Sequence, residues 1–212
     1  MSPSDASHPP RRRTLGGRVL AGLTPADVLR LLGLLIVPAA GAVAGWPSAA
    51  AMFLVFGGQW LLRWLAGGSL LDWTGQVLLL AAGWASAIGL YHRIEGLDLV
   101  MHAAVTGVVT GLVAVVVRSA LRRRGRTGGP VTPAEAVRTL GPVICVLGLA
   151  AAGTALGVVW EVAEWWGHHE VTEEIGVGYD DTLGDLTADL VGAVTAAVVA
   201  VASARSVRRG AR

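Results

Sequence analysis

The chain has 212 residues, of which 53% are hydrophobic and only 15% are charged, and its formal net charge is +2. Soluble domains carry about 25% charged residues, so this composition excludes an ordinary soluble protein. All 17 basic residues are arginines, and many lie in short runs outside the apolar segments, as in membrane topology signals. We therefore expect an all-α polytopic membrane protein, with the lipid bilayer as its partner and no nucleic-acid partner.

Six apolar stretches approach the roughly 20 residues that a membrane-spanning helix needs. A basic, disordered tail is expected at 1–26, a transmembrane domain at 27–205 and a second basic tail at 206–212. The predicted spans, in chain order, are 27–45, 49–66, 70–91, 98–118, 139–166 and 182–204.

The segments between these spans carry local signals. The stretch GWPS at 45–48 predicts a tight link between the first two spans. The longest polar loop is expected at 122–133, and Thr132 with Pro133 and Glu135 predicts a helix start at its end.

The distribution of charge predicts the orientation in the membrane. With six spans and the N-terminus inside, 16 of the 17 arginines lie on the inner side and only Arg93 lies outside. Eleven of the 15 acidic residues lie on the outer half. The positive-inside rule then predicts that both termini face the cytoplasm.

Acidic and histidine side chains recur at helical spacing on the last three predicted spans, so each set shares one helix face. The sets are Asp98 and His102, then Glu161, Glu164 and His168, and finally Asp181, Asp185 and Asp189. Ionisable side chains inside a membrane are costly and usually functional. We therefore expect a pocket near the extracytoplasmic surface.

So many carboxylates in a medium of low dielectric need neutralisation by a divalent cation, by shared protons or by a basic partner. Bound Mg²⁺, Mn²⁺, Ca²⁺ or Zn²⁺ is the leading interpretation. Glu161 or His102 would then act as general base. The expected metal ligands are Asp98, Glu164, Asp181, Asp185 and Asp189.

Three functions fit such a pocket. The first is a metal-dependent membrane enzyme that acts on a lipid or cell-envelope substrate by hydrolysis or head-group transfer. The second is a cation or proton transporter. The third is a non-catalytic envelope or assembly factor, in which the polar cluster only stabilises the bundle through shared protons.

Several of these residues also have purely structural interpretations. Asp180 or Asp181 would cap the last helix, and Thr182 with Asp185 resembles a capping box. His168 and His169 fit an interfacial loop. Two further groups are expected at the membrane surface, the solvated Glu170, Glu173 and Glu174 and the aromatic belt of Trp160, Trp165 and Trp166.

Three motifs resemble those of a known family. GLDLVMHAAVTG at 96–107, WEVAEWW at 160–166 and GYDDTLGDLTADLVGA at 178–193 resemble the YjdF-like bacterial inner-membrane proteins, a family of unknown function. VanZ-like membrane proteins are more remotely similar. The matching residues are Asp98, His102, Gly107, Glu161, Glu164, Trp165, Asp181, Thr182 and Asp185. The resemblance implies a shared site on the late helices but no particular reaction.

Overall fold

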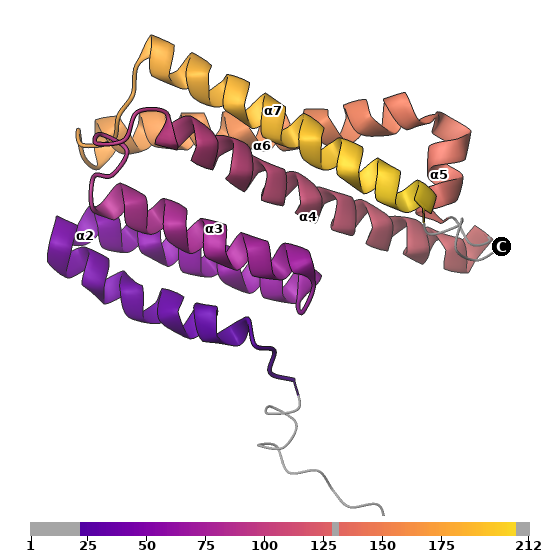
Figure 1. Cartoon of the computed structure of the whole chain (residues 1–212), viewed down its shortest axis with the longest axis horizontal. Helices are drawn as coiled ribbons and strands as arrows, with labels where there is room; N and C mark the ends of the chain where they lie inside the picture. Colours follow the sequence, from indigo (N-terminus) through magenta and orange to yellow (C-terminus); the bar gives the residue numbers. More distant parts are fainter. Residues whose placement is uncertain (1–21, 129–131, 207–212) are drawn as a thin grey trace, which may run out of the picture.

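A computed structural model describes residues 22–128 and 132–206, in which every regular element is a helix (Figure 1). The tails expected at 1–26 and 206–212 lie almost entirely outside these residues. The helices are α2 (Asp27–Ala66), α3 (Leu70–Ala87), α4 (Leu97–Gly128), α5 (Pro133–Leu140), α6 (Pro142–Glu170) and α7 (Tyr179–Ser206). Helices α2 and α3 form one group, and α4, α6 and α7 pack beside it as a second.

Helix α2 consists of two arms that meet at a kink. Gly45 has a φ of 82°, a backbone conformation that a residue without a Cβ adopts readily. Pro47 follows in the first turn of the second arm, where its missing N–H costs little. The arms fold back on each other, since Ala40 and Met52 belong to one buried cluster. The link predicted at 45–48 is thus present as this turn.

Helix α3 is shorter than the predicted span at 70–91. Its first turn is capped by Ser69, whose Oγ accepts a hydrogen bond from the backbone N–H of Asp72 at 3.2 Å. The helix ends at Ala87, and Gly89 then reverses the chain with a φ of 64°. The polar link that follows leads directly into α4.

Glycines allow the helices of the second group to approach closely. A Cβ at Gly192 of α7 would collide with the backbone carbonyl of Ala103 on α4. A Cβ at Gly153 of α6 would collide with the hydroxyl of Thr110, also on α4. Small residues at such crossings are typical of helix packing in membranes. The backbones of α4, α6 and α7 are therefore close enough for side chains near the helix ends to meet.

Two predicted helix starts had different outcomes. The capping box of Thr132 and Glu135 is confirmed at the start of α5, where each side chain accepts a hydrogen bond from the other residue's backbone N–H. Helix α7 begins already at Tyr179, so Asp180 does not cap it and no capping box starts at Thr182. Carboxylates in this first turn are instead stabilised by the helix dipole.

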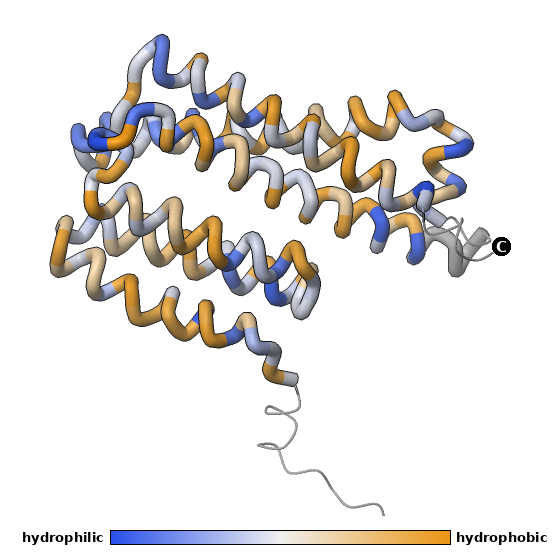
Figure 2. The backbone as a smooth tube through the Cα atoms, in the orientation of Figure 1, coloured by the Kyte–Doolittle hydropathy of each residue, from blue (hydrophilic) through white to orange (hydrophobic). Residues whose placement is uncertain are grey.

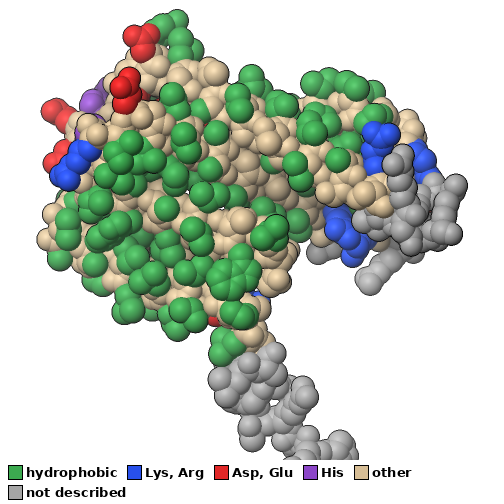
Figure 3. All heavy atoms as spheres, viewed as in Figure 1, with side chains coloured by type: hydrophobic (Ala, Val, Ile, Leu, Met, Phe, Trp, Pro, Cys, Tyr) green, Lys and Arg blue, Asp and Glu red, His purple; other side chains and the backbone are tan. Residues whose placement is uncertain are grey.

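Hydrophobic residues predominate along the helices (Figure 2), and many of their large apolar side chains are exposed. Among the residues that the structure describes, four helices are long and apolar enough to cross a membrane, namely α2, α4 over Leu97–Arg122, α6 and α7. Acidic and histidine side chains gather at one end, on the left of Figure 3, and most visible arginines lie at the other. This arrangement is typical of a membrane protein, with lipid against the middle of the helices and charge at both ends.

The close contact at Gly192 yields a prediction about stability. Gly192→Ala should lower the free energy of unfolding by about 1–3 kcal/mol, because the new methyl group meets rigid backbone on α4. Gly148→Ala on α6 is the matched control, since a Cβ there meets nothing within 4 Å. Unfolding of both variants in detergent micelles checks this, and equal stability would contradict the close packing of α4 against α7.

Candidate functional site

A cluster of carboxylates surrounds His102 where α4 and α7 begin and α6 ends. The Nε2 atom of His102 lies 3.8 Å from Asp98 Oδ1 and 3.9 Å from Asp185 Oδ1. The Nδ1 atom lies 3.7 Å from Glu161 Oε1 and 3.3 Å from Asp189 Oδ1. Each ring nitrogen therefore faces its own pair of carboxylates, contributed by three different helices.

Glu161 and Asp189, the two acids that face Nδ1 of His102, are almost completely shielded from solvent. Asp189 is 1% exposed, and its Oδ1 accepts a hydrogen bond of 2.5 Å from the hydroxyl of Thr106. Within the described residues, Asp189 Oδ2 and Glu161 Oε1 are buried without a hydrogen-bond partner. A Cβ at Gly157 would collide with Asp189 Oδ2, so this glycine makes room for the carboxylate. Buried oxygens without partners are costly, and a cation or a proton bound between them would lower that cost.

Two overlapping triads of this cluster have the composition and spacing of metal sites. One is Asp98, His102 and Asp185, and the other is His102, Glu161 and Glu164. In each triad one ligand atom per residue lies within 4.8 Å of the others. Carboxylate and imidazole together suit Mn²⁺ and Zn²⁺, and carboxylate oxygens also suit Mg²⁺ and Ca²⁺.

Other predicted polar residues lie apart from these triads. Asp181 is exposed in the first turn of α7 and belongs to neither triad. His168 Nδ1 lies 2.7 Å from the carbonyl oxygen of Ile175, and His169 Nδ1 lies 2.7 Å from that of Trp165. Both histidines thus bind local backbone at the end of α6, which favours the structural interpretation of these two side chains.

Tyr91, in the link between α3 and α4, lies beside the cluster. Its hydroxyl donates a hydrogen bond of 2.9 Å to the carbonyl oxygen of Ala82. Burial, followed by the negative charges of Asp98 and Glu164, raises the pKa of Tyr91 above its ordinary value. Sequence analysis placed no site residue in this link, because an aromatic residue at a span end is also typical of interfacial anchoring.

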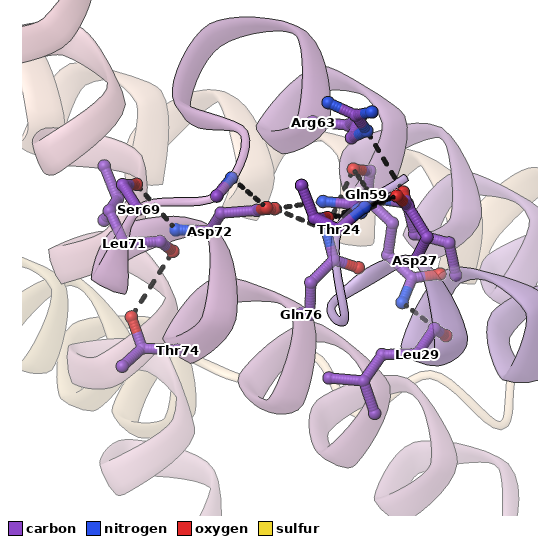
Figure 4. Close-up of polar contacts among 12 residues, drawn as sticks. Thr24, Asp27, Leu29, Gln59, Arg63, Ser69, Leu71, Asp72, Thr74 and Gln76 are labelled. Carbon is purple, nitrogen blue, oxygen red and sulfur yellow. Dashed lines mark hydrogen bonds and ion pairs between the residues drawn. The ribbon is translucent and has the colours of Figure 1, made fainter. Parts of the chain in front are cut away.

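A second set of buried charges lies at the opposite end of the bundle, between the two arms of α2 and α3 (Figure 4). Arg30 of the first arm forms ion pairs with Asp27 on the same arm and with Asp72 on α3. Arg63 of the second arm donates from Nε to Asp27 Oδ1 at 3.0 Å. Two guanidinium groups and two carboxylates thus neutralise one another, which allows their burial.

Two glutamines complete this set. Gln59 donates to the carbonyl oxygen of Leu29 at 3.2 Å, and Gln76 donates to Asp72 Oδ1 at 3.0 Å. A Cβ at Gly33 would collide with the amide oxygen of Gln59, so the glycine lets the arms approach here. We call the set the arginine network. It comprises Asp27, Arg30, Gln59, Arg63, Asp72 and Gln76.

Sequence analysis assigned the charges of the arginine network only to one side of the membrane. The signal that would have found it is the spacing of polar residues within apolar helices. Asp27 and Arg30 lie three residues apart, and Asp72 and Gln76 lie four apart, so each pair shares one helix face.

Long apolar helices with their charges at the two ends define a helical membrane protein. The chain belongs to the family described as "Predicted membrane protein (DUF2238)", whose model matches residues 29–206. Comparison with curated proteins and with solved structures found no match. The match includes the whole cluster around His102 and all of the arginine network except Asp27. The finer resemblance to YjdF-like and VanZ-like proteins stays a prediction.

The arginine network predicts a large effect of removing one charge. Arg30→Met should lower the free energy of unfolding by about 3–5 kcal/mol, because Asp72 is 0% exposed and would lose the guanidinium group with which it is paired. The double variant Arg30→Met/Asp72→Leu should recover most of that loss. Unfolding in detergent micelles checks both variants, with the exposed Arg118→Gln as the control. A wild-type stability for Arg30→Met alone would contradict the burial of this pair.

Proposed function

We propose that the protein crosses the bacterial cytoplasmic membrane six times, with both ends in the cytoplasm. The two arms of α2 supply two crossings, and α3, α4, α6 and α7 supply one each. Most arginines lie at the end of the bundle opposite the acidic cluster, the same end at which α2 begins and α7 ends (Figure 3). Under the positive-inside rule, this supports the proposed orientation. The cluster around His102 then lies near the extracytoplasmic surface.

We further propose that this cluster binds one divalent cation between Asp98, Asp185 and the Nε2 atom of His102. The observation that carries this proposal is that each ring nitrogen of His102 faces its own pair of carboxylates. A histidine that binds metal through one nitrogen usually donates its other N–H to a carboxylate. Asp189 Oδ1 lies 3.3 Å from His102 Nδ1, and Thr106 holds that same oxygen. Asp189 is then a positioning residue.

The proposed activity is hydrolysis or head-group transfer on a lipid or cell-envelope substrate. Asp98, 38% exposed, forms the open rim of the cluster and lies at the depth of lipid head groups in the proposed orientation. The cation would polarise a phosphoryl or carbonyl oxygen of the substrate. Glu161, with its unpartnered Oε1, would accept a proton from the attacking water.

Transport fits the bundle less well than catalysis. A transported cation or proton needs polar groups along its path to the other side of the membrane. The sequence has no ionisable residue between His102 and Arg118 on α4, and none between Asp189 and Arg205 on α7. The ionisable side chains of these two helices thus extend inward from one surface only part of the way, as in a pocket.

The first test is the metal content of the purified protein in detergent. Wild-type protein should hold about one equivalent of a divalent cation after reloading with Mg²⁺, Mn²⁺, Ca²⁺ or Zn²⁺, as elemental analysis measures. Asp185→Asn should lose it, because the substitution removes a charged ligand that is almost fully buried. Glu173→Gln is the matched control, since this exposed acid lies near the same surface outside the triads.

Absence of metal from the reloaded wild type would contradict the proposal and favour shared protons. An enzyme additionally requires turnover, measured as release of labelled head groups from phospholipid vesicles containing the protein. Asp185→Asn should abolish that release while the thermal unfolding midpoint stays near wild type. Metal binding without turnover of any envelope substrate would favour the assembly-factor interpretation.

A second substitution separates positioning from ligation. Asp189→Asn should weaken metal binding roughly 10–100-fold, because it removes the charge that holds His102 in the ligating tautomer. The variant should still reach the wild-type stoichiometry at saturating metal. Competition against a chelator measures both quantities. Complete loss of binding at saturation would instead make Asp189 a direct ligand.

A further inference from the structure

A pocket of about 300 Å³ lies at the arginine-rich end of the bundle, far from His102. It is formed where the short helix α5 crosses the start of α6 and the end of α7. Its lining residues are Ala134, Val137, Arg138, Gly141, Pro142 and Arg205. Neither the cluster around His102 nor the arginine network contributes to it.

The pocket carries excess positive charge. Arg138 forms an ion pair of 3.9 Å with Glu135, but both side chains are about half exposed, and such pairs contribute little. Arg205 is exposed on the last turn of α7, and no acidic residue follows Asp189 in the sequence. Two guanidinium groups therefore lie at the rim of one pocket, where they attract an anion.

An apolar track leads away from the same pocket along α6. The side chains of Leu140, Val143, Ile144 and Leu147 are each more than half exposed. In α6, positions 143, 144 and 147 lie on one helix face, and Leu140 lies just before it at the end of α5. On the inner side of α5, by contrast, Val137 is buried against the bundle. The pocket thus joins a cationic rim to a lipid-facing hydrophobic strip.

We propose that this pocket binds the head group of an anionic phospholipid, with one acyl chain lying along the apolar track of α6. A phosphodiester matches the fork geometry of guanidinium groups, and basic pockets between helices at the membrane surface recognise such head groups. Free phosphate would contact the two arginines at the rim but would make no contact with the apolar track. The combination of the two therefore points to a lipid, bound independently of the chemistry at His102.

Titration of the full-length protein in detergent micelles with short-chain phosphatidylglycerol tests this, with the thermal unfolding midpoint as readout. Phosphatidylglycerol should raise the midpoint, and zwitterionic phosphatidylcholine should not. Arg138→Gln/Arg205→Gln should weaken the apparent affinity roughly thirtyfold, since each arginine near an anionic lipid contributes about fivefold. The matched control is Arg118→Gln/Arg122→Gln, which removes two exposed arginines of α4 that do not line the pocket. This control should change the apparent affinity less than about twofold.

Three results would overturn the proposal. An equal loss of apparent affinity in the two double variants would mean that phosphatidylglycerol is attracted by diffuse surface charge and not by a specific site. An equal rise with phosphatidylcholine would mean general lipid stabilisation. An equal rise with inorganic phosphate would mean a site for a free anion. If the first double variant does not fold, Arg205→Gln alone carries the test, with an expected loss of about fivefold.

Discussion

A charge among apolar helices must be neutralised where it lies, and this constraint decides how both polar regions of the bundle are built. The arginine network satisfies it internally, because Arg30 and Arg63 face Asp27 and Asp72. The cluster around His102 does not. A single imidazole there faces four carboxylates, whereas the arginine network has two guanidinium groups for two carboxylates. The charges of the first region balance within the protein, and the second region is the one for which we propose a bound cation.

Glycine has the same role in both regions. Gly33 stands opposite the amide oxygen of Gln59 in the arginine network, and Gly157 stands opposite the carboxylate of Asp189 in the cluster. In each case the space of a missing side chain is filled by a polar group from the neighbouring helix. These glycines therefore allow the helix backbones to pack closely and also leave room for a buried polar group.

Much of the architecture follows from hydropathy and turn residues. The helical class, the turn near Gly45 and the cap at Thr132 could be predicted, because each depends on local sequence. Helical spacing also predicted that acids would gather near His102. It could not show that Asp181 belongs to neither triad, because position 181 shares a helix face with Asp185 but lies one turn further out, where the side chain is exposed.

The arginine network was missed for a related reason. Arg30 and Asp72 are 42 positions apart, and nothing local indicates that they pair. Charge counting assigned both residues to the same side of the membrane but did not indicate that they pair. Their burial depends on the fold of α2 at Gly45, which returns the second arm to the first and brings α3 alongside.

The same turn bears on how the chain enters the membrane. Arg30 emerges from the ribosome with Asp27 three residues ahead on its own helix, so it has an anionic partner from the outset. Arg63 arrives next and shares that carboxylate, which leaves two cations on one anion. Only the synthesis of α3 delivers Asp72 and balances the charge. The two arms of α2 together with α3 therefore bring all four charges of the arginine network into balance before α4 is made.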